Sequence, residues 1–486
     1  MKKVLISAVI VLITSVSAFG EESPGLLEWS VTGELNLAPS VLDGNPRIYD
    51  NINTAVYYNY DFFSLLAEIS IKNDKKYSPA EDFWFGHYFY MDQGGMFFDF
   101  DLLSLQFGRF YQEDLVNSPY SLFFSSMDLP ALLTDITFHT GIFTYSSRWI
   151  VLNNRSDPQI GYPSGYPDRG MNYKIYAFQF GDLRVGLQDV VIYVDYIFDV
   201  EYFLSPIPHT IGQMHRDEGK PWSQDTNDNI IMGLFADWRK PRFYLYAQWL
   251  LDDINLDFII PNFLRDTWGD RQIPQKTAWS LGGYYDFPFG RLGFYHAGAT
   301  KYTFAPNTDW ESNPYQYSYY PNVEYQLEDG TILTLDYIDN YIGYKYGENN
   351  LAFLFDYSNT FSRVDFNASL EYVVSGSKSP ANPWHEYLSH SAAGSNTRLL
   401  DDPILEHTVA AQVAASWSWR KLSVYSRLRL GGVFNKLELE PAGDLGPDIF
   451  RPQPGNHEVI YRLTLGLTYV FGSAGVENET QTSVKR

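Results

Sequence analysis

The sequence predicts an all-β protein, a transmembrane antiparallel β-barrel of about 18 strands (16–20) with short periplasmic turns and long extracellular loops. Three observations predict this fold. Apolar and polar residues alternate along many segments, the connections alternate between short and long, and aromatic residues make up 17% of the chain. Barrels of this class carry an outward apolar band between two aromatic girdles, and their turns differ in length between the two ends.

The first twenty residues predict a cleaved signal peptide. Lys2 and Lys3 precede an apolar stretch from Val4 to Ile13, and the small residues at 16–18 fit the site at which a signal peptide is cleaved. The predicted location is therefore the bacterial outer membrane, reached after export through the inner membrane. The chain has no cysteine, which argues against a lipid anchor, and no later run of about 18 apolar residues predicts a spanning helix.

Residues 21–471 form one predicted barrel domain, because no linker or change of composition divides them, and residues 472–486 are a predicted disordered periplasmic tail. The net charge of −23 repels phosphate backbones, so nucleic acid is not an expected partner. The expected partners are outer-membrane lipid, surface polysaccharide and, during insertion, the barrel-assembly machinery. No cofactor is expected.

The clearest strand is predicted at residues 242–251, where one face is apolar and the other is polar. The same alternation recurs at 364–371, 409–418 and 422–430. Mixed charge on the polar faces fits either the field of a diffusion pore or salt bridges that fill a narrow interior. The candidate lumenal residues are Arg242, Tyr244, Gln248, Asp365, Asn367, Glu371, Gln412, Arg427 and Arg429.

The lengths of the connections favour a barrel over a sandwich, because short turns at one end and long loops at the other are typical of outer-membrane barrels. From residue 171 onward, tight turns are predicted at 181–182, 239–241, 287–289, 329–330, 359–360 and 420–421. Long stretches are predicted at 193–227, 252–275, 305–320, 376–405 and 436–456, with a short link at 347–350 as the exception.

Strands in the amino-terminal third are predicted near 26–37, 51–60, 62–72, 82–90, 95–101, 103–111, 132–140 and 142–152. With thirteen later strands they sum to 21, whereas a bacterial barrel closes with an even number, so at least one of the early predictions is expected to be wrong. Ser118 and Pro119, followed by residues 120–127, predict a short periplasmic or lumenal helix, with a loop as the alternative.

The last predicted strand resembles the C-terminal targeting strand of outer-membrane barrels, which tends to finish on an aromatic residue. Here that residue is Phe471, and the polar tail that follows it departs from the pattern. The residues of its apolar face are Tyr461, Leu463, Leu465, Leu467, Tyr469 and Phe471.

No motif of an enzyme stands out, since GxSxG, HExxH, Walker and Rossmann patterns are all missing and the nine histidines are scattered. The chain is therefore not expected to be an enzyme. Asp252 and Asp253, with Asp257 close behind, have a spacing that suits calcium, but a solvated acidic loop edge is the favoured interpretation. No metal site is predicted.

Aromatic and polar residues are dense between Tyr302 and Tyr325. Sugars pair their apolar ring faces with aromatic rings while their hydroxyls reach polar neighbours, so this segment is a candidate glycan-binding loop. An interface girdle or a self-packed loop is the alternative. The candidate residues are Trp310, Tyr315, Tyr317, Tyr319 and Tyr320.

Two segments resemble the Wzi capsule-assembly family of outer-membrane barrels: MDQGGMFFDFDLLSLQFGRF at 91–110 and NIIMGLFADWRKPRFYLYAQWLLDDI at 229–254. The first has a Gly-Gly turn that leads into a hairpin ending in Gly-Arg, and the second ends in Asp-Asp after a Tyr-rich strand. The resemblance implies an 18-stranded barrel with periplasmic helices that holds capsular polysaccharide at the cell surface. No motif carries over individual sugar-binding residues.

The leading hypothesis is therefore an outer-membrane barrel that binds surface polysaccharide or assists its assembly. The alternative is a porin or solute transporter for passive diffusion, which the mixed lumenal charge favours. A third hypothesis is a surface adhesin whose loops bind host protein.

Overall fold

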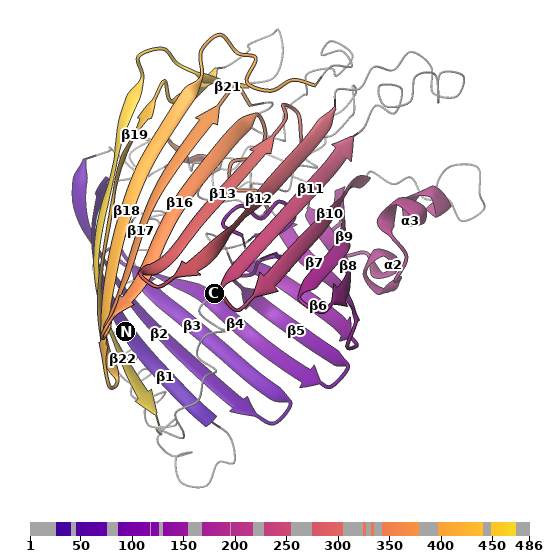
Figure 1. Cartoon of the computed structure of the whole chain (residues 1–486), viewed down its shortest axis with the longest axis horizontal. Coiled ribbons are helices and arrows are strands. Elements are labelled where there is room, and N and C mark those ends of the chain that lie inside the picture. Colours follow the sequence, from indigo (N-terminus) through magenta and orange to yellow (C-terminus); the bar gives the residue numbers. More distant parts are fainter. Residues whose placement is uncertain are drawn as a thin grey trace.

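A single antiparallel sheet of 18 strands closes on itself to form a barrel, which confirms the predicted fold class (Figure 1). The computed structural model describes residues 26–39, 45–74, 86–116, 118–125, 130–153, 168–194, 196–216, 228–253, 275–304, 324–326, 332–334, 343–378, 397–440 and 449–472. The expected signal peptide at 1–20 and residues 473–486 of the expected tail lie outside these ranges.

The barrel strands follow one another around the wall in chain order. They are β1 (Leu26–Pro39), β2 (Pro46–Tyr60), β3 (Phe63–Lys72), β4 (Tyr88–Phe100), β5 (Leu103–Phe110), β6 (Ala131–His139), β7 (Phe143–Asn153), β8 (Arg169–Phe180), β9 (Leu183–Val194), β10 (Asp228–Lys240), β11 (Phe243–Asp253), β12 (Lys276–Phe287), β13 (Gly290–Ala299), β16 (Asn350–Phe361), β17 (Val364–Ser375), β18 (Glu406–Trp419), β19 (Leu422–Phe434) and β22 (His457–Gly472). Two short hairpins lie outside this sheet: β14 (Glu324–Gln326) with β15 (Ile332–Thr334), and β20 (Leu437–Glu440) with β21 (Ile449–Pro452).

The barrel is closed by pairing between its first and last strands. β22 runs antiparallel to β1, from Gly472 opposite Glu28 to Leu463 opposite Leu37. At the start of this seam the rings of Trp29 and Phe471 stack with their centroids 3.8 Å apart. The predicted C-terminal strand is therefore the strand that removes the last free sheet edge.

The connections differ sharply between the two ends of the barrel. One end carries turns of two or three residues, at 61–62, 101–102, 140–142, 181–182, 241–242, 288–289, 362–363 and 420–421. The other end carries the 40–45 link and the long connections at 73–87, 111–130, 154–168, 195–227, 254–275, 300–349, 376–405 and 435–456. The predicted short link at 347–350 is wrong, because it is the last part of one long connection between β13 and β16.

The predicted strand count exceeds 18 for two identifiable reasons. The strands predicted at 82–90 and 95–101 are one strand, β4, because Gly94 and Gly95 continue the strand instead of turning. A Cβ on Gly95 would lie 2.2 Å from the Phe107 carbonyl oxygen, so glycine here permits close strand packing. The predicted hairpin around 329–330 is the separate β14–β15 pair and not part of the wall.

The helix predicted at 118–127 is wrong over its described part, since residues 118–125 form turns and bends. Three consecutive apolar residues are buried there, and a helix would have turned them in different directions. The described helices are α2 (Val200–Leu204) and α3 (His209–Arg216), which lie outside the barrel wall in the β9–β10 connection (Figure 1). No described helix is long and apolar enough to cross a membrane.

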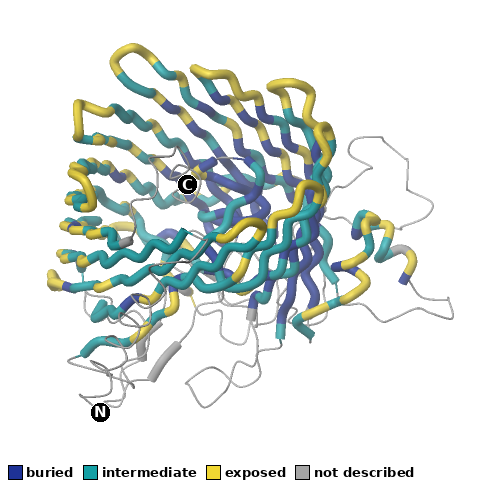
Figure 2. The backbone as a smooth tube through the Cα atoms, turned by 90° about the horizontal axis from the view of Figure 1, so that it is seen from below, coloured by how far each residue is buried: buried dark blue, intermediate teal, exposed yellow. Residues whose placement is uncertain are grey.

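The two faces of the wall differ as the alternation predicts. Leu234, Leu245 and Trp249 point outward and are exposed, whereas Phe235 and Tyr246 on the same strands point inward and are buried. Figure 2 shows that buried positions gather along one side of the barrel and in the chain that crosses its interior.

Candidate functional site

Two connecting segments fold into the bore of the barrel, and we call their described residues the plug. They are residues 111–116 and 118–125, between β5 and β6, and residues 343–349, before β16. The two segments meet where the Gly343 N–H donates a hydrogen bond to the Ser125 carbonyl at 2.9 Å. The plug is therefore assembled from parts of the chain more than 200 residues apart.

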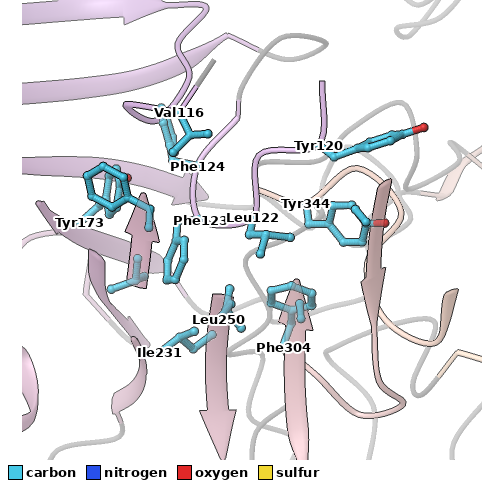
Figure 3. Close-up of a cluster of buried hydrophobic side chains, with 14 of the residues drawn as sticks. Val116, Tyr120, Leu122, Phe123, Phe124, Tyr173, Ile231, Leu250, Phe304 and Tyr344 are labelled. Atoms are coloured by element: carbon cyan, nitrogen blue, oxygen red, sulfur yellow. The ribbon is translucent and has the colours of Figure 1, made fainter. Parts of the chain in front are cut away.

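The apolar part of the plug packs against strands β10 and β11. Leu122 and Phe123 are fully buried and face Ile231 and Leu250 of the wall (Figure 3). Burying an apolar side chain of this size contributes about 1.5–3 kcal/mol. A Cβ on Gly233 would lie 2.6 Å from the Phe123 ring, so the wall has room for this ring only because residue 233 is glycine.

Polar contacts fix the plug to the same side of the wall. Gln248 of β11 accepts a hydrogen bond from the Leu122 N–H at 3.2 Å and donates one to Asp114 Oδ2 at 2.7 Å. Two wall arginines donate to plug carbonyls: Arg184 Nη2 to Leu115 at 2.6 Å, and Arg148 Nη1 to Glu113 at 3.4 Å. These bonds satisfy backbone groups of an irregular segment that is shielded from water.

The plug also reaches a distant wall of the barrel. Tyr120 and Tyr346 donate their phenol hydrogens to the same oxygen of Glu371, Oε1, at 3.0 and 2.6 Å. Glu371 lies on β17, which is eight strands from β5 in one direction around the wall and ten in the other. The plug therefore crosses the bore from one side to nearly the opposite side. Arg429 Nη2 lies 3.7 Å from the second oxygen of Glu371.

Two adjacent plug carboxyls have shifted pKa values. Burial raises the pKa of Glu113 to about 7, and the neighbouring charge of Asp114 adds to the rise. Burial also raises the pKa of Asp114 to about 6, against the opposing effect of hydrogen bonds from Gln248 and the Val116 N–H. The charge of the plug therefore changes between mildly acidic and neutral pH.

Strands β17–β19, β22 and β1–β4 form a wall with a different interior, which we call the polar side. Its inward residues are linked by hydrogen bonds across neighbouring strands. Asn51 donates to Glu34 at 3.0 Å, and Asn53 donates to Glu68 at 2.9 Å. Similar bonds join Thr464 to Asn36, Gln93 to Glu68 and Lys72 to Asp92.

The inward residues of this polar side on β1–β4 were not among the predicted lumenal residues. The available signal was the alternation of Glu34 and Asn36 with Leu35 and Leu37, which is the pattern that identified the later strands. In the structure Leu35 and Leu37 are exposed on the outer face, and Glu34 and Asn36 point inward.

The structure places the candidate lumenal residues in three environments. Tyr244 and Gln248 are buried where the plug packs, and Tyr244 belongs to the apolar cluster. Glu371, Gln412 and Arg429 are partly buried on the polar side. Asp365, Asn367 and Arg427 are exposed on inward faces of that side. The prediction for Arg242 is wrong, because strand β10 ends at Lys240 and Arg242 is exposed in the following turn.

The candidate glycan-binding residues Trp310, Tyr315, Tyr317, Tyr319 and Tyr320 lie outside the described residues. Asp252, considered for calcium, accepts a hydrogen bond from the Phe304 N–H at 2.7 Å. This bond holds the start of the connection between β13 and β16. The targeting-strand residues Tyr461, Leu463, Leu465, Leu467, Tyr469 and Phe471 all lie on β22. Of these, Leu465, Leu467 and Tyr469 are exposed on the outer face.

A cavity of about 600 Å³ lies at the short-turn end. Its inward lining carries charges of both signs: Arg184 pairs with Asp237 at 2.7 Å, and Arg291 pairs with Asp286 at 2.7 Å. The Arg291 guanidinium also lies 3.8 Å from the centre of the Tyr284 ring. The mouth of the bore is therefore polar at this end, whereas the plug packs on the β10–β11 wall through apolar residues such as Leu122 and Phe123.

Solved structures show which barrel this fold resembles. Wzi of Escherichia coli, described as an outer-membrane protein involved in group 1 capsule assembly and a carbohydrate-binding β-barrel, aligns with a TM-score of 0.53 at 11% identity. The alignment covers 96% of this chain and 88% of Wzi. This chain is similar in fold to Wzi. No protein-family model and no curated protein matches the sequence.

Two other solved structures align less well. OccK8 (OprE) of Pseudomonas aeruginosa has a TM-score of 0.45 at 7% identity, over 92% of this chain and 98% of that one. A loop-deletion mutant of OmpT from Vibrio cholerae has a TM-score of 0.36 at 10% identity, over 92% and 100% of the two chains. The similarity to Wzi extends over nearly the whole barrel, and at 11% identity it concerns the fold alone.

Proposed function

We propose that this chain is an outer-membrane barrel whose bore is closed by the plug and which binds surface polysaccharide through its long connections. The observation that carries the proposal is the span of the plug, from the end of β5 to Glu371 on the nearly opposite strand β17. A bore crossed by a packed segment suits a binding protein better than a channel, because passage would require the apolar packing to be broken.

Two further observations support this proposal. The outer face of the wall is apolar, with Leu234, Leu245 and Trp249 exposed, as a lipid-facing wall requires. Wzi, the similar barrel, is described as carbohydrate-binding. By this reasoning the short turns are periplasmic and the long connections face the cell exterior, where Trp310 and Tyr317 remain candidates for stacking on sugar rings.

The test combines two measurements on the refolded mature protein. In planar bilayers we expect no stable conductance steps, and in glycan arrays we expect retention of a subset of polysaccharides. The Trp310→Ala and Tyr317→Ala variants should lose glycan retention, because each removes a ring face. Trp249→Ala, which alters an outward aromatic of the wall, is the matched control and should retain binding. Stable conductance by the intact barrel without glycan retention would contradict the proposal.

A porin or solute transporter is the second candidate, and the polar side is the observation that favours it. Arg427 and Arg462 are exposed on inward faces there, so charged groups line the part of the bore next to the plug. Conductance by the intact protein would support this function, with Asp365, Glu371, Arg427 and Arg429 as candidates for ion selectivity.

A further inference from the structure

The described residues of the β9–β10 connection, 196–216, lie against the outer wall of the barrel, and we call this segment the strap. It contains α2 and α3 and packs on the outward faces of β7–β10 (Figures 1 and 2). Its two ends continue into β9 and β10 at the long-connection end. The strap therefore covers a part of the outward wall, whereas elsewhere outward residues such as Leu234 and Leu245 are exposed.

The wall beneath the strap is polar, unlike the outward wall elsewhere. Lys174 of β8 and Asp189 of β9 point outward and yet are at most 1% exposed, because the strap covers them. Ser147 of β7 is also buried. A lysine or aspartate exposed to lipid on this wall would have a high free-energy cost. Burial of Lys174 and Asp189 under the strap avoids that cost.

The wall supplies hydrogen-bond donors to the irregular backbone of the strap. Five strap carbonyls accept bonds from wall side chains: Ile197 from Trp149 Nε1, Phe203 from Ser147 Oγ at 2.7 Å, Ser205 from Tyr145 at 3.2 Å, Pro206 from Tyr176 at 3.0 Å, and Ile207 from Lys174 Nζ at 2.6 Å. Non-helical backbone is tolerated at membrane depth only where its polar groups are satisfied in this way.

The strap N–H groups are satisfied in a similar manner. Asp199 caps α2 by accepting from the Tyr202 N–H at 2.9 Å, and the His209 N–H donates to Asp189 Oδ2 of the wall at 2.5 Å. Pro206 and Pro208 have no N–H to satisfy. At the positions between the two helices that pack on the wall, each backbone N–H is therefore either hydrogen-bonded or replaced by a proline nitrogen.

The outward surface of the strap is mainly apolar. Five large apolar side chains, Phe198, Val200, Leu204, Ile207 and Ile211, are 42–61% exposed, and Glu201, Pro206 and His215 are the other exposed residues in the described part of the strap. The main charged group, Arg216, is buried and pairs with Asp199 and Glu201, each at 2.9 Å. A segment at a water interface would turn its polar groups outward, whereas here Arg216 and His209 are buried and the half-exposed Glu201 is held in an ion pair with Arg216.

The strap also reaches far down the wall. The Pro206 carbonyl is bonded to Tyr176, which is four residues from the end of β8 at the short-turn side. We propose that the strap is embedded in the acyl-chain layer of the membrane and that its outward apolar residues continue the lipid-facing surface of the barrel. This inference rests on the proposed membrane insertion. The partner it assigns to this face is lipid, and a second copy of the chain is the competing occupant.

The absence of cysteine allows a direct test with single cysteines carrying nitroxide labels. The variants Leu204→Cys and Ile211→Cys place labels on the strap. Leu234→Cys on the outward wall is the lipid control, and Gly141→Cys, at a turn where a Cβ meets nothing within 4 Å, is the water control. Each protein is refolded into phosphatidylcholine and phosphatidylglycerol vesicles, and collision rates with oxygen and with a water-soluble nickel chelate are compared.

We expect both strap labels to match the Leu234 label, with oxygen collisions favoured over nickel collisions. Labels at 204 and 211 that favour nickel, while the label at 234 favours oxygen, would overturn the inference and leave membrane insertion intact. Protection from both reagents, together with spin–spin broadening, would overturn it in favour of a second copy. A label at 234 that favours nickel would refute the membrane insertion on which the inference rests.

Discussion

The two sides of the barrel differ in what fills the bore next to them. On β6–β13, which we call the filled side, inward residues such as Phe235 and Tyr244 are buried by the plug. On the polar side, inward residues such as Asn53 and Glu68 bond to one another and remain partly exposed. Alternation along a strand therefore identifies which residues face the interior, but the occupant of that interior is determined by a segment elsewhere in the chain.

The largest effect is expected from removing a plug ring on the filled side. Phe123→Ala should lower the free energy of unfolding by about 3–5 kcal/mol, because a fully buried ring leaves a cavity. Urea unfolding of the protein in vesicles measures this change. Tyr57→Ala is the matched control on the polar side, where the ring is only half buried, and it should have a clearly smaller effect. Equal losses would show that the two sides are packed alike.

The next prediction concerns the contact that joins the two sides. Tyr120→Phe removes the hydrogen bond to Glu371 and should lower the free energy of unfolding by about 1.5–3 kcal/mol, the usual range for bonds to a charged group. It should also produce intermittent conductance steps as the end of the plug detaches. Tyr372→Phe, which loses an exposed bond to His407 on the outer face, should produce no steps. Silence from Tyr120→Phe would mean that the apolar packing alone holds the plug.

A smaller effect is expected from pH. A carboxyl whose pKa rises on folding holds its proton more tightly in the folded protein, so the free energy of unfolding falls as pH rises from the unfolded pKa to the folded one. For Asp114 and Glu113 this window runs from about 4 to about 7, with no further change from these groups above it. Unfolding curves between pH 4 and 8 measure the slope. Asp114→Asn should flatten it, and an unchanged slope in this variant would contradict the assignment to the plug.

The smallest effect on stability is expected on the polar side. Arg427→Glu changes an exposed inward charge and should alter the free energy of unfolding by less than about 0.5 kcal/mol. In a barrel opened by the Tyr120→Phe change, the same substitution should shift the reversal potential toward cations. Lys421→Glu, at a short turn, is the charge-matched control. A large loss of stability in Arg427→Glu would show that this side is as tightly packed as the filled side.

The sequence was sufficient to predict the architecture because the outward face of the strands follows one rule, which is that its side chains are apolar. Leu245 and Trp249 alternate with polar or aromatic residues, and the short turns repeat at one end, so both the strands and their pairing could be inferred. The errors arose where a local pattern has two solutions. Gly94 and Gly95 fit a turn as well as a tightly packed strand, and only the neighbouring strand decides between them.

The candidate site was less predictable, because its members are distant in sequence. Tyr120, Tyr346 and Glu371 meet only when the bore encloses the plug, and no spacing in the sequence links them. Ser118 and Pro119 predicted a helix over residues 120–127, because a local N-cap signal carries no information about the wall residues on which Leu122 and Phe123 pack. The strap was missed for a related reason: Lys174 and Asp189 on an outward face are understandable only when the segment that covers them is known.

The seam between β1 and β22 makes barrel closure a contact between strands that are far apart in the chain. These two strands must find each other in the register that sets Trp29 against Phe471. Any chain that lacks its final strand would carry two unpaired sheet edges, and such edges promote aggregation. A chain that lacks β22 is therefore expected to stay open at this seam, with the inward residues of β1 and β19 accessible to solvent and to proteases.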